Sequence, residues 1–252
     1  MPVITLLTDL GTTDSYVGEL KGVLASLAAS ATVVDITHQV APGDVRAAAY
    51  VLGRAWHRFP AGTVHLVIVD PGVGTSRASL ALRCSGHYFV APDNGVLSRV
   101  FEHEVGDVIA LPTPQHAAPT FHGRDVYAPA VAAIACGQEL TALGPAFLGV
   151  PKRLAWTKPH YEGKTVVGEV IYVDRFGNLV TSLTPELVPA YATVEVEGID
   201  LGALRQAFGE VPAGGLLAYV GSGGTVEVAV RDGSAARRLG LGVGERVRVR
   251  LG

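Results

Sequence analysis

The sequence predicts an α/β N-terminal domain with a mostly parallel central sheet, followed by a smaller all-β C-terminal domain. Three observations support this fold class. Apolar segments of strand length alternate with amphipathic segments of helix length in the first half of the chain. Residues 64–69 are apolar or nearly so throughout, which is typical of a strand buried on both faces of a parallel sheet. The second half contains short alternating segments typical of antiparallel sheets.

The elements of the N-terminal domain follow from apolar spacing and capping residues. Asp14 or Ser15 can cap the first helix, and Asp44 can cap the second, because their side chains accept hydrogen bonds from backbone N–H groups. The expected elements are a strand over 3–7, a helix over 16–27, a strand over 32–36, a helix over 45–59, the strand over 64–69, a hairpin over 79–91, a short helix over 96–101 and a helix over 126–136.

A change of pattern predicts the domain boundary. We expect the α/β domain over 1–150, a polar, proline-punctuated linker over 151–164, and the β-rich domain over 165–252. The expected C-terminal elements are strands over 165–173, 178–182, 192–196, 216–220, 225–230 and 246–251, with a short helix over 235–239.

Composition excludes several classes of function. The 252 residues are 48% hydrophobic and 17% charged, with a formal net charge of −3, so neither a nucleic-acid-binding nor a membrane-binding surface is indicated. Cys84 and Cys136 lie in apolar segments and favour buried thiols over a disulfide. Neither a signal peptide nor an apolar run of about 18 residues is present. We therefore expect a cytoplasmic protein.

The strand over 64–69 leads into the first candidate site. Asp70 follows its carboxyl end, and Arg77 follows on a loop rich in glycine and proline. Ligands bind beyond the carboxyl ends of strands in open α/β sheets, so this pair is a candidate site. Asp9 follows the first strand in the same way. The alternative is a turn with a surface ion pair.

Other polar residues also allow two interpretations. His122 precedes a helix, where its protonation can be tuned near neutral pH, although most single histidines are surface or hydrogen-bonded residues. Asp93 and Asn94 could contact a ligand, although capping and turn chemistry explains them adequately. Residues 174–178 combine an acid, an aromatic residue and an amide, and residues 221–224 form a glycine turn whose amides can approach an anion or simply connect two strands.

The standard catalytic signatures do not occur in this sequence. It lacks the GxGxxG and GxxxxGK[ST] phosphate loops, the GxSxG nucleophile elbow, and the CxxC and HExxH metal-ligand spacings. Nucleotide binding through a phosphate loop, α/β-hydrolase chemistry and the common metal sites are therefore not indicated.

A set of motifs in order resembles the S-adenosyl-L-methionine (SAM) hydroxide adenosyltransferases, which are relatives of the bacterial fluorinase and chlorinase. The motifs are TDLGTTD at 8–14, DITH at 35–38, DPGVGT at 70–75 with Arg77, PDNG at 92–95, FHGRD at 121–125 and DRFGN at 174–178. The resemblance implies an α/β domain joined to a β-rich domain, a homotrimer with sites between subunits, and conversion of SAM and water to adenosine and L-methionine without a cofactor or metal.

The resemblance also implies roles for individual residues. The family's catalytic trio falls on Asp70, Arg77 and His122, and Asp9 falls where the family binds the ribose hydroxyls. The implied substrate-binding residues of the remaining motifs are Phe121, Asp174 for the methionine ammonium, Phe176 beside adenine, Asn178 at the adenine edge and, in a looser alignment, Ser222 at the methionine carboxylate.

Two departures separate this chain from the halogenases. Pro42 and Gly43 stand where the halogenases place an aromatic residue near the sugar, and their extra loop in the first domain is missing. Asp70 stands where they lack a carboxylate, which favours water over halide as the nucleophile. A halide-dependent substitution and a non-catalytic SAM- or adenosine-binding module are the alternative functions.

In the implied reaction the leaving group needs no catalytic help, and only the nucleophile has to be activated. Departure of a sulfonium gives neutral methionine, so no general acid is needed. Water needs a base to take its proton and a fixed charge to favour the resulting anion. Arg77 can supply that charge, His122 can accept the proton, and Asp70 can orient either residue or share the water.

Overall fold

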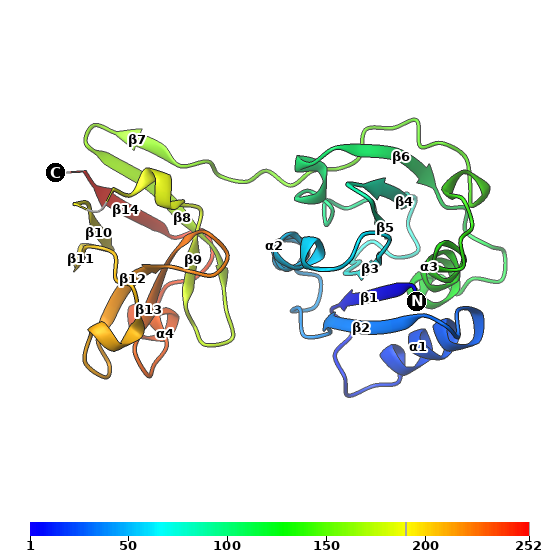
Figure 1. Cartoon of the computed structure of the whole chain (residues 1–252), viewed down its shortest axis with the longest axis horizontal. Coiled ribbons are helices and arrows are strands. Elements are labelled where there is room, and N and C mark those ends of the chain that lie inside the picture. Colours follow the sequence, from blue (N-terminus) through cyan, green and yellow to red (C-terminus); the bar gives the residue numbers. More distant parts are fainter. Residues whose placement is uncertain (190, 252) are drawn as a thin grey trace. The chain divides into compact units, whose positions relative to one another are not determined.

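The computed structural model describes residues 1–189 and 191–251, which form two compact units (Figure 1). The first unit is Met1–Leu154, and the second begins at Ala155. The division between the units falls after Leu154, inside the segment expected as a linker over 151–164.

The expected linker over 151–164 is divided between the units rather than lying free. The backbone N–H of Lys152 donates to Asp93 Oδ1 at 2.7 Å, and that of Leu154 donates to Ser98 Oγ at 2.7 Å, both within the first unit. Strand β7 (His160–Glu162) pairs with the second unit's sheet. Although this segment contains prolines, its backbone N–H groups find hydrogen-bond partners, in each case within the unit that they adjoin.

The first unit contains a six-stranded mixed sheet in the order β2-β1-β3-β5-β4-β6. Its β2-β1-β3-β5 half is parallel, and β4 runs antiparallel to both of its neighbours. The mostly parallel sheet and the hairpin expected at 79–91 are thereby confirmed. The strand bounds are β1 Val3–Thr8, β2 Thr32–Thr37, β3 Val64–Ile68, β4 Ser79–Cys84, β5 His87–Pro92 and β6 Val105–Ala110.

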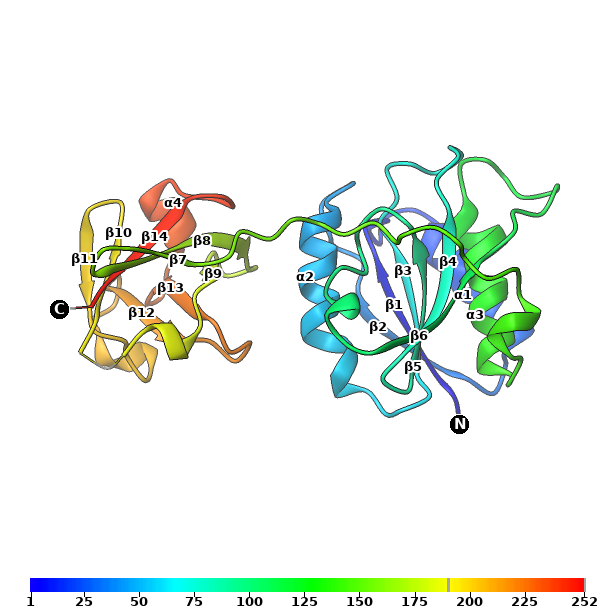
Figure 2. The same cartoon turned by 90° about the horizontal axis from the view of Figure 1, so that it is seen from above.

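Helices cover both faces of this sheet, as Figure 2 shows: α2 lies on one face, and α1 and α3 lie on the other. Successive residues of a strand point to opposite faces. Leu6 of β1 accordingly packs in the core beneath α1 and α3, whereas Leu7 packs in the core beneath α2. The helix bounds are α1 Tyr16–Leu27, α2 Val45–Ala55 and α3 Ala128–Ala135.

Several expected helix boundaries are wrong. The second helix is α-helical only to Ala55 and continues as a 3₁₀ turn, Trp56–Arg58. The helix expected over 96–101 is replaced by turns and a 3₁₀ helix, Val100–Glu102. The segment Gly123–Tyr127 is a π-helix that precedes α3. Pro129 has no N–H, so a regular α-helix cannot run unbroken through this segment.

The second unit is an eight-stranded antiparallel sheet in which β11-β10-β14-β8-β9-β13-β12 form a continuous path and β7 adds to β8. Its end strands β11 and β12 contact each other, so the sheet nearly closes on itself. The sequence did not indicate β6, β7 or β11. The bounds are β8 Thr165–Val173, β9 Leu179–Thr181, β10 Thr193–Val196, β11 Ile199–Gly202, β12 Leu216–Val220, β13 Val226–Val230, β14 Arg246–Arg250 and α4 Ala235–Leu239.

Candidate active site

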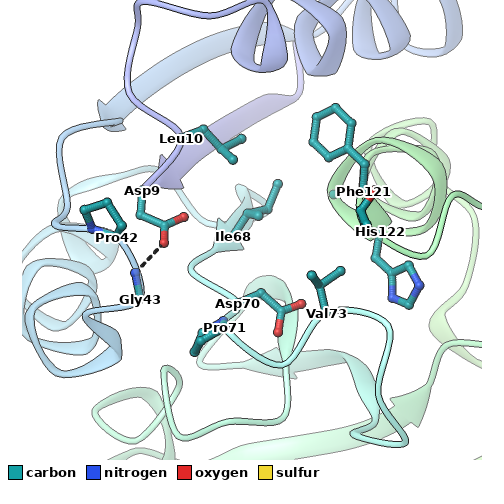
Figure 3. Close-up of a pocket in the computed structure, with 12 residues that line it drawn as sticks. Asp9, Leu10, Pro42, Gly43, Ile68, Asp70, Pro71, Val73, Phe121 and His122 are labelled. Carbon is teal, nitrogen blue, oxygen red and sulfur yellow. Dashed lines mark hydrogen bonds between the residues drawn. The ribbon is translucent and has the colours of Figure 1, made fainter.

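A cavity of about 330 Å³ lies at the carboxyl ends of β1 and β3 in the first unit (Figure 3). Asp9 follows the end of β1, and Asp70 follows the end of the neighbouring strand β3, so the parallel pairing brings both carboxylates to one edge of the sheet. The cavity is lined by Asp9, Leu10, Pro42, Gly43, Ile68, Asp70, Pro71, Val73, Thr120, Phe121, His122 and Gly123. Its size suits a small organic ligand.

Asp9 is fixed by the loop between β2 and α2. The Gly43 N–H donates to Asp9 Oδ2 at 2.8 Å, the interaction drawn as a dashed line in Figure 3. Gly43 has a φ of +75°, a left-handed conformation that glycine adopts without strain. Pro42 and Gly43 both line the cavity on this side.

Asp70 and Arg77 form a two-point ion pair. Arg77 Nε donates to Asp70 Oδ1 at 2.8 Å, and Arg77 Nη2 donates to Asp70 Oδ2. The two side chains are only 6% and 5% exposed, so this is a buried charge pair and not the surface ion pair considered from the sequence. Fork-shaped pairing of this kind fixes both the position and the orientation of the carboxylate.

The remaining donors of Arg77 are also engaged. Nη1 donates to Ala78 O at 3.1 Å and to Ser79 Oγ at 2.9 Å, and Nη2 lies 3.4 Å from His122 Nδ1. Each of the guanidinium's five N–H groups therefore has an acceptor within the protein. Because Asp70 and His122 line the cavity and Arg77 lies behind them, the arginine acts on the cavity through these two residues.

His122 is the titratable group beside this ion pair. Burial lowers the pKa of His122, and the positive charge of Arg77 lowers it further, with partial opposition from Asp70 and Asp125. The imidazole is therefore neutral at pH 7. Nη2 of Arg77 lies 3.4 Å from His122 Nδ1, which suits the neutral tautomer with its ring proton on Nε2. The Nδ1 lone pair then faces the guanidinium, so Nδ1 can take up a proton only as this long contact gives way.

Phe121 provides an apolar wall of the cavity. Its ring makes an edge contact with Tyr16 at 5.3 Å between centroids, and the Arg124 guanidinium lies 5.1 Å from it. Arg124 also binds Glu19 of α1 at 2.8 Å and Asp125 at 2.7 Å. A Cβ added at Gly123 would come within 2.9 Å of Ile68 Cδ1, so the close approach that brings Phe121 and His122 to the strand end requires glycine.

The second unit holds three of the predicted residues in one loop between β8 and β9. Asp174 Oδ1 accepts the N–H groups of Phe176 and Asn178, each at 2.9 Å, and Asp174 Oδ2 accepts Asn178 Nδ2 at 2.9 Å. The carboxylate therefore shapes its own loop. Phe176 is 74% exposed at the loop tip, whereas Asn178 is buried. The loop presents a fixed aromatic ring to its surroundings.

Ser222 does not lie beside that loop. It belongs to the turn between β12 and β13, where Val220 pairs with Val226 and the Val226 N–H bonds to Leu183 O at 2.8 Å. The loop at 174–178 lies at the other end of β9, where Gly177 O accepts the Ala236 N–H at 2.9 Å. The register of β9 and β13 therefore separates the turn from the loop.

Sequence reasoning missed the residues that hold the site together. Ser79 Oγ bridges Arg77 and the Tyr127 hydroxyl, which lies 3.2 Å from it, and Arg77 lies over the Tyr127 ring at 5.7 Å. Asn94 Nδ2 donates to Val69 O at 2.8 Å and so fixes the end of the chain just before Asp70. The turn chemistry at Asn94 was the one signal present, while Ser79 and Tyr127 resemble ordinary core residues in the sequence.

The described residues contain neither a group of side chains arranged for a metal ion nor a membrane-spanning helix. No group of three or more histidine, cysteine, aspartate and glutamate residues within 1–189 and 191–251 is arranged to hold a metal ion. In the same part of the chain, no helix has the length and apolar character needed to cross a bilayer.

Two family models match most of this chain. Residues 4–144 match the model of the SAM hydroxide adenosyltransferase N-terminal domain, and residues 168–248 match that of the C-terminal domain. The chain belongs to the SAM hydroxide adenosyltransferase family. Residues 4–144 lie in the first compact unit of the structure, and residues 168–248 lie in the second.

Individual proteins of known name or structure are also similar to this chain. An (R)-S-adenosyl-L-methionine hydrolase from Thermus thermophilus is 41% identical, with 99% of this chain and all of the relative covered. A crystal structure of a conserved protein from Thermotoga maritima superposes with a TM-score of 0.91 at 38% identity, covering 98% of this chain and 99% of that one. A fluorinase from Nocardia brasiliensis is more distant, at 29% identity over all of this chain and 97% of the fluorinase.

Proposed function

We propose that this protein hydrolyses SAM to adenosine and L-methionine. Family membership, the name of the similar Thermus thermophilus enzyme and the cavity at the ends of β1 and β3 support the proposal. The observation that carries it is the buried Asp70–Arg77–His122 cluster, in which a carboxylate and a neutral imidazole face one cavity and a guanidinium holds both from behind.

The reaction follows from that arrangement. A water held by Asp70 and His122 attacks C5′ of the ribose, and the C5′–S bond breaks with its electron pair going to sulfur. The water proton passes to His122 Nδ1 as the 3.4 Å contact of that nitrogen with Arg77 Nη2 gives way. The positive charge of the sulfonium disappears as methionine leaves. A general base of this kind accelerates a reaction by roughly 10²–10⁴-fold. Asp9 is proposed to bind the ribose hydroxyls, which places C5′ over the cluster.

The proposed roles of Asp70, Arg77 and His122 differ from those that their residue types suggest in isolation. Arg77 has its N–H groups bound to protein acceptors, so we assign it to orienting Asp70 and His122 rather than to direct contact with the nucleophile. Asp70 accepts a hydrogen bond from the water, and its paired charge stabilises the proton on His122.

The alternative is a halide-dependent substitution of the kind named for the fluorinase relative. Asp70 argues against it, because a carboxylate at the edge of the cavity repels a halide anion and accepts hydrogen bonds from water. A non-catalytic binding module is the third candidate, and a water-activating cluster contributes nothing to binding alone.

One assay separates these functions. The purified protein is incubated with SAM in water enriched in ¹⁸O, with and without chloride, and the nucleoside products are analysed by mass spectrometry. We expect adenosine with ¹⁸O at its 5′ position, unchanged by chloride or by a chelator. A 5′-chloro product would support substitution by halide, and intact SAM would support the binding module. Both sulfonium epimers are supplied, because the Thermus relative is named for the (R) form.

The residues of the second unit enter the same proposal. We assign Asp174 to the methionine ammonium and Phe176 and Asn178 to adenine. The looser match of Ser222 to the methionine carboxylate is left out of this assignment, because its turn lies away from the loop that holds Asp174. A homotrimer with sites between subunits, a reaction without cofactor, and a cytoplasmic location complete the proposal. Mixing inactive Asp70→Ala and Asn178→Ala proteins tests the assembly, because subunit exchange restores some intact sites only if each site draws on two subunits.

A further inference from the structure

We infer that His38 is a positioning residue for Asp9 and that it acts through the hydroxyl of Thr8. The inference rests on the proposed function, because it concerns the affinity of Asp9 for the ribose hydroxyls. It assigns a role to the DITH motif at 35–38, which the cavity itself does not explain, since neither Thr8 nor His38 lines it.

The first contact fixes the residues on both sides of Asp9. Thr8 is the last residue of β1, and its Oγ1 accepts the N–H of Leu10 at 3.2 Å. The same oxygen lies 2.9 Å from His38 Nδ1. Thr8 is fully buried and His38 is 5% exposed, so water does not compete for these bonds. A single hydroxyl therefore holds the chain immediately before and after Asp9.

The other side of the imidazole faces an acidic side chain. His38 Nε2 lies 3.2 Å from Asp35 Oδ1, and Asp35 Oδ2 accepts from Lys21 Nζ at 2.6 Å. A hydroxyl has one proton and two lone pairs, so Thr8 Oγ1 can accept from Leu10 and bond to His38 Nδ1 at the same time. The segment 35–38 therefore reaches the Asp9 loop through the Thr8 hydroxyl.

A second set of contacts comes from the same segment. The carbonyl of His38 accepts the N–H of Gly11 at 2.8 Å, and Gly43 donates to the Asp9 carboxylate at 2.8 Å. The loop between β2 and α2 therefore holds the Asp9 loop at its backbone and at its carboxylate. Loss of the Thr8 hydroxyl removes its contacts with Leu10 and His38 while leaving the Gly11–His38 backbone bond and the Gly43–Asp9 bond in place.

The test compares adenosine with 2′,3′-dideoxyadenosine, which lacks the hydroxyls that Asp9 is proposed to bind. Affinities of the full-length protein for both nucleosides are measured by titration calorimetry. Thr8→Val removes the hydroxyl with little change of shape, and Thr8→Ser restores it. We expect Thr8→Val and His38→Ala to weaken adenosine binding about tenfold relative to dideoxyadenosine, and Thr8→Ser to keep the wild-type ratio.

Thr5 offers a matched control on the same strand. It is also fully buried, and its hydroxyl lies 2.7 Å from Nδ1 of another histidine, His65, which does not line the cavity. Thr5→Val should therefore lower stability without changing the ratio of the two affinities. Should Thr8→Val fail to fold, Asp35→Ala removes the half-exposed carboxylate that lies 3.2 Å from His38 Nε2 and should reduce the ratio in the same direction.

The outcomes distinguish the two proposals. Equal weakening of both nucleosides by Thr8→Val, or a selective loss with Thr5→Val, overturns the role of Thr8 and His38. If the wild type discriminates between the nucleosides and Thr8→Val leaves that discrimination unchanged, only the positioning inference fails. If the wild type binds both nucleosides equally, the ribose role of Asp9 fails and takes this inference with it, while hydrolysis of SAM is judged separately by the ¹⁸O assay.

Discussion

Arg77 binds Asp70 through two N–H groups and reaches His122 Nδ1 with Nη2 at 3.4 Å, so one guanidinium sets the geometry of both residues that face the cavity. The arrangement is over-determined, because Ala78 and Ser79 hold the other end of the same guanidinium. Asp70 and His122 are therefore held rigidly, as a pair of proton acceptors that line the cavity.

Replacing Arg77 by lysine keeps the positive charge but removes the planar guanidinium that binds both oxygens of Asp70. Lysine cannot bind both oxygens of Asp70 and reach His122 at once. We expect kcat for SAM hydrolysis to fall about 10²-fold, with KM changed little, because misplacement by about 1 Å has that effect on an oriented reaction. Steady-state kinetics test this, and a melting curve shows whether the variant is folded. A loss confined to KM would instead make Arg77 a substrate-binding residue.

The acid limb of activity reports on His122. Burial and Arg77 lower the pKa of His122, so the imidazole stays neutral as the pH falls past the ordinary histidine value of about 6.5. Activity that needs the neutral base is present above the lowered pKa and is lost as pH falls through it. We expect the acid limb of kcat/KM, which reports the free enzyme, to have its midpoint below about 6.5. A midpoint above that value would contradict the assignment.

Ser79 and Tyr127 are expected to act on turnover from behind the cavity. Ser79→Ala leaves one N–H of Arg77 without its side-chain acceptor, and Tyr127→Phe removes the hydroxyl that binds Ser79. A net hydrogen bond contributes about 0.5–1.5 kcal/mol, and one to a charged group about 1.5–3 kcal/mol, so the serine variant should lose more kcat than the tyrosine variant. Single-turnover measurements give the comparison, and the reverse order would argue against this chain of contacts.

A buried histidine far from the cavity predicts how stability depends on pH. His65 bonds to Thr5 and His87, and burial, with a smaller contribution from His87, lowers the pKa of His65 to about 3. The unfolded chain binds a proton near pH 6.5, whereas the folded chain does not, so stability is full above that pH and is lost between about pH 6.5 and 3.

The slope of that loss is about 1.4 kcal/mol per pH unit for one such group. Urea unfolding at pH 7.5 and 5.0 measures it. His65→Gln should be less stable at pH 7.5 but should lose less stability on acidification than the wild type. An identical pH dependence in both proteins would show that His65 does not carry the effect.

Much of the fold was readable because it depends on local patterns. The apolar run at 64–69 predicted a strand buried on both faces, and Val64–Ile68 is one. Asp44 was predicted to cap a helix, and its side chain accepts the Ala47 N–H at 2.8 Å. Edge strands such as β6 and β7 were missed because their exposed residues, among them Asp107 and Tyr161, carry little apolar signal.

The sequence by itself determined the main strands and helices, though not β6, β7 or β11, and, through its motifs, the family. Its motifs also nominated Asp70, Arg77 and His122, although residue types alone left a turn with a surface ion pair as the alternative at the first two. Only the tertiary structure decided that Arg77 lies behind the cavity and that Ser79, Tyr127 and Thr8 support the site. The reason is physical: capping and periodicity act between near neighbours, whereas the direction of a buried hydrogen bond depends on strands and loops brought together by folding.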